Sequence, residues 1–129
     1  MPSRDLKDLD SKLVKAYNTA KGIYANRFPN EPQPFITCTY RSNEEQNQLY
    51  ALGRTVKGKI VTNAKAGQSK HNSLPSKAFD IAFIGLDKKL NWSNKHFKNF
   101  ADIVKEVDAT IEWGGVWKFI DLPHYQLND

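Results

Sequence analysis

Apolar residues recur at helical spacing in two long stretches of the chain. Between Arg4 and Arg27, leucine, alanine and tyrosine return every three or four positions, which places them on one face of a helix. Ser3 can cap the start of this helix, and prolines shortly after Arg27 end it. A second long helix is predicted from a cap at Ser93 to about Asp108. Each helix therefore has one apolar face to bury against another layer.

Other stretches alternate apolar and polar residues, which is typical of strands with one buried face. The clearest are residues 35–40 and 79–84. In the second of these, Asp80 should lie on the face opposite the large apolar side chains. Two further strands are predicted at 110–113 and 124–127, and in the last one His124 and Gln126 should share a face.

Between these regions the sequence predicts a short helix and a long surface segment. Ser42 and Glu45 have the spacing of a capping box, so a helix should begin there and continue to about Leu52, where Gly53 stops it. Residues 54–69 contain glycines, lysines and little periodicity, as in segments that line a binding cleft. The whole pattern predicts an α+β fold, in which a small, mostly antiparallel sheet packs against two main helices.

Length and composition limit what the chain can be. With 129 residues it can bury one core, so we expect residues 1–129 to form a single domain. The first residues lack an apolar signal segment, and no apolar run approaches the length of a membrane helix. Cys38 is the single cysteine, which excludes an internal disulfide and agrees with synthesis in a cytoplasm.

The charge of the chain favours anionic partners. Its net charge is +5, from 19 Lys and Arg against 14 Asp and Glu, and such a surface suits a wall polymer or a nucleic acid. The basic residues are scattered and are not interleaved with stacking aromatics, which argues against nucleic acid. The alternative interpretation is that the extra lysines only keep the protein soluble.

Two of the three histidines and two aspartates provide candidate chemistry. Two imidazoles and one carboxylate can hold a zinc ion and leave its fourth position open to water. His71, Asp80 and His124 supply such a set, and Asp121 lies close enough to His124 in sequence to handle protons. Each has a structural alternative, because a lone histidine is usually a surface or hydrogen-bonded residue and an aspartate can simply start a turn. His96, inside the second helix, is interpreted in that structural way.

A series of short motifs runs along nearly the whole chain. They are Thr39-Tyr-Arg-Ser, Glu45-Gln46, Leu49-Tyr50, Gly53-Arg-Thr, Val61-Thr-Asn-Ala, Ser69-x-His, Ala78-x-Asp, Trp113-Gly-Gly-x-Trp and Asp121-x-x-His-Tyr. In this order they resemble the zinc peptidases that cut peptidoglycan stem peptides, a family with D-alanyl-D-alanine carboxypeptidases and dipeptidases. The most similar branch is the L-alanyl-D-glutamate peptidases that phages use as endolysins. The chain departs from that family at 72–79, where Leu74 and Pro75 look like an insertion that a bulging loop would absorb.

The resemblance implies a role for each matching residue. His71, Asp80 and His124 would bind Zn²⁺, and Asp121 would be the general base toward water and then the proton donor to the leaving amine. Arg41 would place its guanidinium near the reacting carbonyl or a substrate carboxylate. The side chains implied in substrate binding are those of Ser69, Gln68 and Trp113.

Several assignments stay open from the residues alone. Trp113 can equally pack in the core, and Gly114 and Gly115 can serve a tight turn. Cys38 is an alternative nucleophile paired with His71, although its position in a strand among apolar residues favours a buried, inert thiol. The reaction could be that of a D-alanyl-D-alanine carboxypeptidase or dipeptidase. Outside catalysis, a metal-bound wall-binding module or a nucleic-acid binder are the rivals.

The resemblance also implies a place of action. An endolysin of this type would be made in the host cytoplasm without a signal peptide and would reach the wall after the membrane is permeabilised. We expect peptidoglycan stem peptides as its partner, with no nucleic acid and no stable membrane association. We also expect a monomer without a separate wall-binding domain.

Overall fold

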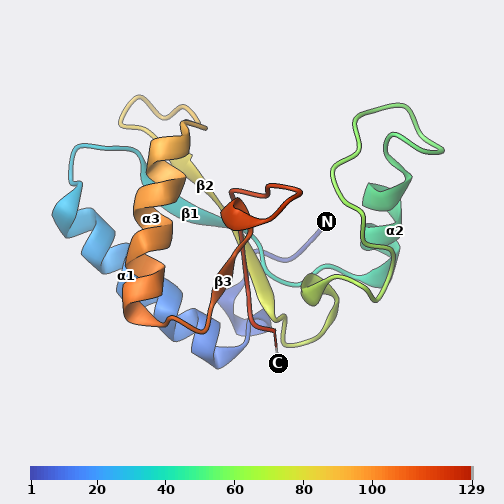
Figure 1. Cartoon of the computed structure of the whole chain (residues 1–129), viewed down its shortest axis with the longest axis horizontal. Coiled ribbons are helices and arrows are strands. Elements are labelled where there is room, and N and C mark those ends of the chain that lie inside the picture. Colours follow the sequence, from blue (N-terminus) through green and yellow to red (C-terminus); the bar gives the residue numbers. More distant parts are fainter. Residues whose placement is uncertain (129) are drawn as a thin grey trace.

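A computed structural model describes residues 1–128 of the chain. The helices are α1 (Ser11–Arg27), α2 (Asn43–Ala51) and α3 (Asn94–Val107). The strands are β1 (Gln33–Cys38), β2 (Ala78–Ile84), β3 (Glu112–Trp113) and β4 (His124–Gln126), and short 3-10 turns occupy Leu6–Asp8, Lys70–Asn72 and Gly114–Val116. The predicted α+β fold with a small antiparallel sheet is confirmed (Figure 1).

The four strands form one sheet in the order β1-β2-β4-β3, and each neighbouring pair is antiparallel. This order places β2 between β1 and β4. Asp80 in β2 is the direct cross-strand partner of Cys38 in β1 and of His124 in β4. Segments far apart in the sequence therefore bring these three side chains to neighbouring positions of the sheet.

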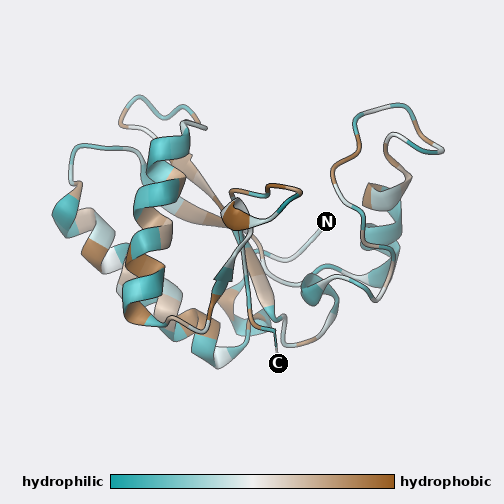
Figure 2. Ribbon diagram, in the orientation of Figure 1, coloured by the Kyte–Doolittle hydropathy of each residue, from teal (hydrophilic) through white to brown (hydrophobic). Residues whose placement is uncertain are grey.

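One face of the sheet is covered by α1 and α3, the two main helices of the prediction (Figure 1). Strand residues at alternate positions pack there, as the period of two requires. Phe79 is fully buried, stacks on Tyr125 at 5.0 Å between ring centroids and meets Tyr17 of α1 edge-on at 5.5 Å. In Figure 2, β1 and β2 are largely hydrophobic, whereas α3 carries hydrophobic positions among hydrophilic ones. The opposite face of β2 and β4 carries Asp80 and His124, as predicted.

Truncation of Phe79 tests this core. Phe79→Ala should lower the free energy of unfolding by about 3–5 kcal/mol, because the lost apolar contacts leave a cavity between two aromatic rings. Denaturant unfolding measures the change. The control is Phe119→Ala, whose ring is 49% exposed and whose loss should cost less than about 0.5 kcal/mol. Equal losses in the two variants would contradict this description of the core.

The short helix α2 stands apart from α1 and α3 (Figure 1). Its predicted capping box is confirmed, because Ser42 Oγ accepts from Glu45 N at 3.1 Å while Glu45 Oε1 accepts from Ser42 N at 2.9 Å. Gly53 follows the helix with φ +79°, a conformation that glycine adopts without strain. Residues 57–69 then form no helix or strand, as the predicted surface segment required.

Two predicted boundaries are wrong. The first helix begins at Ser11 and not at Arg4, because Asp10 is the N-cap and accepts from Lys12 N at 2.9 Å. Ser3 instead donates its hydroxyl to Asp8 at 2.6 Å. The first strand spans Gln33–Cys38 and not 35–40. Its Pro34 is tolerated because β1 is an edge strand.

The start of α3 also differs in detail from the prediction. Ser93 occupies the N-cap position, but its side chain makes no capping hydrogen bond. His96 is not the surface residue of one interpretation, since it is 2% exposed and its ring lies 5.7 Å from that of Phe83, and no hydrogen bond of its ring is found within residues 1–128. None of the helices within residues 1–128 has the length and apolar character needed to cross a bilayer.

Candidate active site

Above the sheet, the carboxylate of Asp80 lies between the rings of His71 and His124. The Oδ1 atom of Asp80 lies 3.3 Å from Nε2 of His71 and 3.1 Å from Nδ1 of His124. In a tetrahedral zinc site, bonds of about 2.0–2.1 Å place neighbouring ligand atoms about 3.3–3.4 Å apart. The two observed separations fit that spacing.

His71 presents its Nε2 to Asp80. It follows the capping residue Ser69, whose hydroxyl accepts from His71 N at 3.2 Å and begins the short turn at Lys70–Asn72. The ring Nδ1 lies 2.7 Å from the carbonyl oxygen of Thr39, so Nδ1 carries the proton and donates it there. The buried Nε2 is the atom that faces Asp80 at 3.3 Å: it carries a second proton when the ring is charged, and it offers its lone pair to a metal when that proton is displaced.

His124 is oriented in the same way by a different partner. Its Nε2 lies 2.8 Å from Oε1 of Gln126, which can accept its proton, and its Nδ1 lies 3.1 Å from Oδ1 of Asp80. With the proton on Nε2, the lone pair on Nδ1 faces Asp80. A second hydrogen bond that fixes the tautomer of a histidine is typical of metal ligands. Both imidazoles are therefore prepared as ligands.

The pKa values of His71 and Asp80 show that this position favours positive charge. Burial by itself lowers the pKa of His71, but the Asp80 carboxylate outweighs burial and raises that pKa to about 10. Burial also opposes ionisation of Asp80, yet the two histidines hold its pKa well below the usual range. A position that retains a proton so strongly attracts positive charge. The donor set and the potential both fit a divalent cation.

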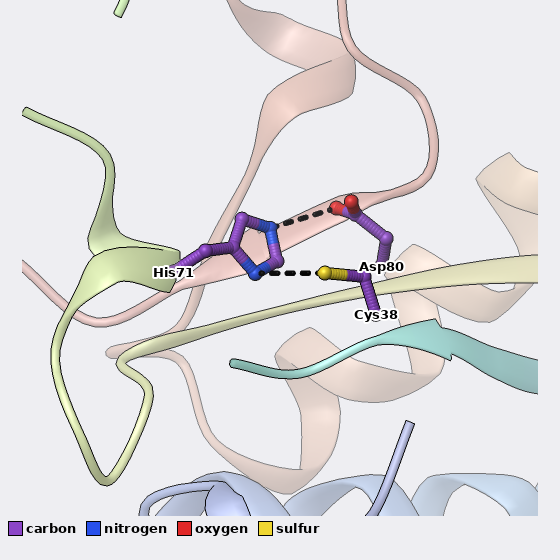
Figure 3. A group of neighbouring side chains, drawn as sticks. All are labelled: Cys38, His71 and Asp80. Carbon is purple, nitrogen blue, oxygen red and sulfur yellow. Dashed lines mark hydrogen bonds and ion pairs between the residues drawn. The ribbon is translucent and has the colours of Figure 1, made fainter. Parts of the chain in front are cut away.

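Cys38, His71 and Asp80 form a second possible metal-binding group (Figure 3). Cys38 Sγ lies 3.7 Å from Nδ1 of His71, whereas Asp80 faces Nε2 on the other side of the ring. Because Nδ1 already donates to Thr39, only Nε2 is free to bind an ion. The geometry thus favours His124 over Cys38 as the third ligand. Cys38 is buried as expected, but it lies beside His71 and Arg41 and not among apolar residues only.

Arg41 approaches the same carboxylate from the other oxygen. Its Nη2 lies 3.5 Å from Oδ2 of Asp80, and its side chain is 12% exposed. Its Nη1 donates to Oε1 of Gln46 at 3.0 Å, and Gln46 in turn donates to the carbonyl of Ala64 at 2.7 Å. Gln46 is fully buried in α2. It ties the guanidinium to the segment that borders the cleft, a role that sequence reasoning did not assign.

Asp121 lies in the same cleft but takes no part in the Asp80 cluster. Burial, reinforced by the negative charge of Asp80, raises the pKa of its carboxyl group. A raised pKa suits a group that must accept and then release a proton near neutral pH. The carbonyl of Asp121 accepts from His124 N at 3.2 Å, so the predicted turn does connect the two residues.

A cleft of about 550 Å³ is lined by Arg41, His71, Asp80, Asp121 and His124. Gln68 and Ser69 are among its lining residues, together with Val61, Thr62 and Ala64, so the segment predicted to line a cleft does border it.

The two tryptophans of the C-terminal motif have different positions. Trp113 is not among the lining residues of the cleft and packs against the core, while its Nε1 donates to the carbonyl of Leu122 at 2.7 Å. Trp117 is in the lining, with its ring 5.1 Å from that of His124. From the sequence, Trp113 could either wall the cleft or pack in the core, and the structure shows the second.

The inserted pair at Leu74 and Pro75 does not reach the cleft. Both residues lie in the connection between the Lys70–Asn72 turn and β2, and Leu74 is 65% exposed. The pair therefore lies in an exposed connection, the place expected for a bulging loop.

With the fold and the cleft described, comparison with known proteins shows that the chain is similar to a peptidoglycan L-alanyl-D-glutamate endopeptidase. It is 41% identical over 100 residues to the peptidoglycan L-alanyl-D-glutamate endopeptidase CwlK of Bacillus subtilis strain 168. The match covers 71% of this chain and 59% of CwlK, so the chain spans about three fifths of that relative. This similarity confirms the resemblance found in the motifs.

A solved structure agrees with the fold. The crystal structure of the Serratia marcescens L-Ala D-Glu endopeptidase ChiX superposes with a TM-score of 0.69 over 99% of this chain and 89% of that protein. At 20% sequence identity, this likeness supports the fold alone. No family model matches the chain.

Proposed function

We propose that this chain is a zinc-dependent peptidase that hydrolyses the L-alanyl-D-glutamate bond of peptidoglycan stem peptides. The observation that carries the proposal is the convergence of His71 Nε2, Asp80 Oδ1 and His124 Nδ1 at separations of 3.3 and 3.1 Å, in a cleft that also holds Asp121 and Arg41. The bond specificity is drawn from the similarity to CwlK.

The metal ligands in this proposal are His71, Asp80 and His124. Zinc held by them would supply Lewis-acid chemistry, lowering the pKa of a water ligand to about 7 and polarising the scissile carbonyl. The hydrogen bonds from His71 to Thr39 and from His124 to Gln126 keep the ligand nitrogens facing Asp80. These hydrogen bonds would orient the two imidazole rings without help from a metal ion.

Asp121 is the proposed proton carrier. Its carboxylate accepts a proton from the attacking water and passes it to the amine that leaves when the peptide bond breaks. Burial makes this carboxylate more basic than an exposed one, so it is suited to both halves of the cycle.

Arg41 and the cleft walls have the remaining proposed roles. The Arg41 guanidinium is a fixed positive charge where the carbonyl oxygen becomes negative, or where a substrate carboxylate binds. Gln68 and Ser69 border the cleft with polar groups that can hydrogen-bond a peptide, and Trp117 offers an apolar wall beside His124. These groups orient the stem peptide against Asp121.

The biological setting is proposed from the motifs. As an endolysin, the protein would act from the host cytoplasm on the wall once the membrane has been permeabilised, and would cause lysis. We propose that it works as a monomer, without stable membrane association.

Digestion of defined muropeptides tests the reaction. Incubation should release new amino groups on D-glutamate, detected by mass spectrometry, and a chelator should abolish the release until zinc is restored. Release of terminal D-alanine alone would instead indicate a carboxypeptidase or dipeptidase.

Two further outcomes would replace the peptidase proposal. Wall binding with no new amino groups would indicate a non-catalytic module. Tight, strongly salt-dependent DNA binding without hydrolysis would indicate a nucleic-acid binder.

A further inference from the structure

The segment from Trp113 to Asp121 folds back so that its two ends touch. Asp121 N donates to the carbonyl of Gly114 at 2.9 Å, and the indole Nε1 of Trp113 donates to the carbonyl of Leu122 at 2.7 Å. His124 N donates to the carbonyl of Asp121 at 3.2 Å. The peptide groups on both sides of Asp121 are therefore held by neighbours.

The carboxylate of Asp121 is held differently. Within residues 1–128, no hydrogen bond to the Asp121 carboxylate is present, although the side chain is partly buried in the cleft wall. Its direction is therefore set by the backbone from which it extends. Any shift of that backbone shifts the carboxylate with it.

Gly114 is required for the close approach of the two ends. A Cβ at this position would overlap the carbonyl oxygen of Asp121 and lie 3.0 Å from the Asp121 Cβ. Gly114 does not have a left-handed φ, so the requirement is for space and not for an unusual conformation. A Cβ at Gly115 would overlap the Trp113 ring, so the second glycine makes room for the indole.

Trp113 connects this loop to the rigid part of the molecule. It belongs to β3, where it pairs with Tyr125 of β4, and its ring packs against the core. The indole N–H is the only polar group of the side chain, and it is used on Leu122, the residue after Asp121. Trp113 therefore links the sheet to the Asp121 turn: its ring packs against the core, and its indole N–H is hydrogen-bonded to Leu122.

We propose that Trp113 and Gly114 are positioning residues that aim the Asp121 carboxylate, while Trp117 is the tryptophan that meets the substrate. This inference rests on the proposed function, since it assigns to Asp121 the proton transfer. It explains why two glycines follow Trp113: one admits the Asp121 backbone, and the other admits the indole.

Gly114→Ala is the direct test. The added methyl should displace Asp121 and lower kcat for muropeptide hydrolysis about 100-fold, the size of effect expected from misplacing a catalytic group by about 1 Å. KM and zinc content should change little, whereas the thermal unfolding midpoint should fall, because the methyl overlaps a backbone oxygen. The matched control is Gly22→Ala in α1, where a Cβ meets nothing within 4 Å and kcat should stay unchanged.

A second pair of variants keeps the proposal testable if Gly114→Ala fails to fold. Trp113→Phe keeps an aromatic ring in the core but removes the N–H, so it should lower kcat and leave KM unchanged. Trp117→Phe should raise KM with a smaller change in kcat.

The outcomes separate the two proposals. An inactive wild-type protein would overturn the proposed function and this inference together. An active wild type with full kcat in both Gly114→Ala and Trp113→Phe would overturn this inference alone. A rise of KM in Trp113→Phe without a fall in kcat would also overturn it, since it would return Trp113 to substrate binding.

Discussion

Asp121→Asn is expected to lower the rate of peptidoglycan hydrolysis by about 10²–10⁴-fold while the protein keeps its zinc. The amide has nearly the shape of the carboxylate, but it cannot accept a proton from water at neutral pH. The carboxylate of Asp121 is not part of the cluster around Asp80, so its loss should leave the ligands in place. The measurements are the release of amino groups from purified wall and the zinc content of the same sample.

The control for this variant is Asp102→Asn. Asp102 lies on the exposed face of α3, where it pairs with Lys98, so the same change of charge should leave the rate unchanged. Loss of zinc in Asp121→Asn would place this residue among the ligands. Undiminished hydrolysis with zinc bound would remove it from the proton-transfer role.

His124→Ala is expected to lose zinc and hydrolysis together, whereas Cys38→Ala should keep both. The two variants discriminate between the possible ligand sets, since Cys38 and His124 are each neighbours of the His71 and Asp80 pair. Only His124 faces the same side of Asp80 as the free Nε2 of His71. Cys38 lies beside Nδ1, which is engaged with the Thr39 carbonyl. Metal analysis of the purified variants measures the result.

The reverse pattern would change the proposed centre. Zinc retained in His124→Ala and lost in Cys38→Ala would make the thiolate a ligand, and the tautomers assigned to both histidines would then be wrong. Hydrolysis that persists in both variants after chelation would remove the metal from the reaction altogether.

Much of the fold was accessible from local patterns. The alternation in β2 places Phe79 in the core and Asp80 on the opposite face, because the period of a strand is two whatever its neighbours are. The capping box at Ser42 was predicted for a similar reason, since its two hydrogen bonds join residues of one turn. The first helix was misjudged where a distant contact intervenes: Asp10 N donates to Ser76 O and Leu9 pairs with Ser76, which separates the N-terminal turn from α1.

For the candidate site too, local patterns determined one part and distant contacts the rest. The order of the histidine and aspartate motifs determined which side chains to consider, and the resemblance it carries was confirmed by the similarity to CwlK. The sequence could not show which nitrogen of each imidazole is free. That depends on the Thr39 carbonyl and the Gln126 amide, which reach the rings only when β1, β2 and β4 pair in register.

The sequence by itself determined the class of elements, the face of β2 that carries Asp80 and the set of residues able to bind a metal, because periodicity and residue chemistry are local properties. Only the tertiary structure decided that Trp117 and not Trp113 borders the cleft, that Gln46 holds Arg41, and that Cys38 lies behind His71. Each of these joins segments far apart in the chain. Their contacts follow from strand register and loop packing, which no short stretch of sequence specifies.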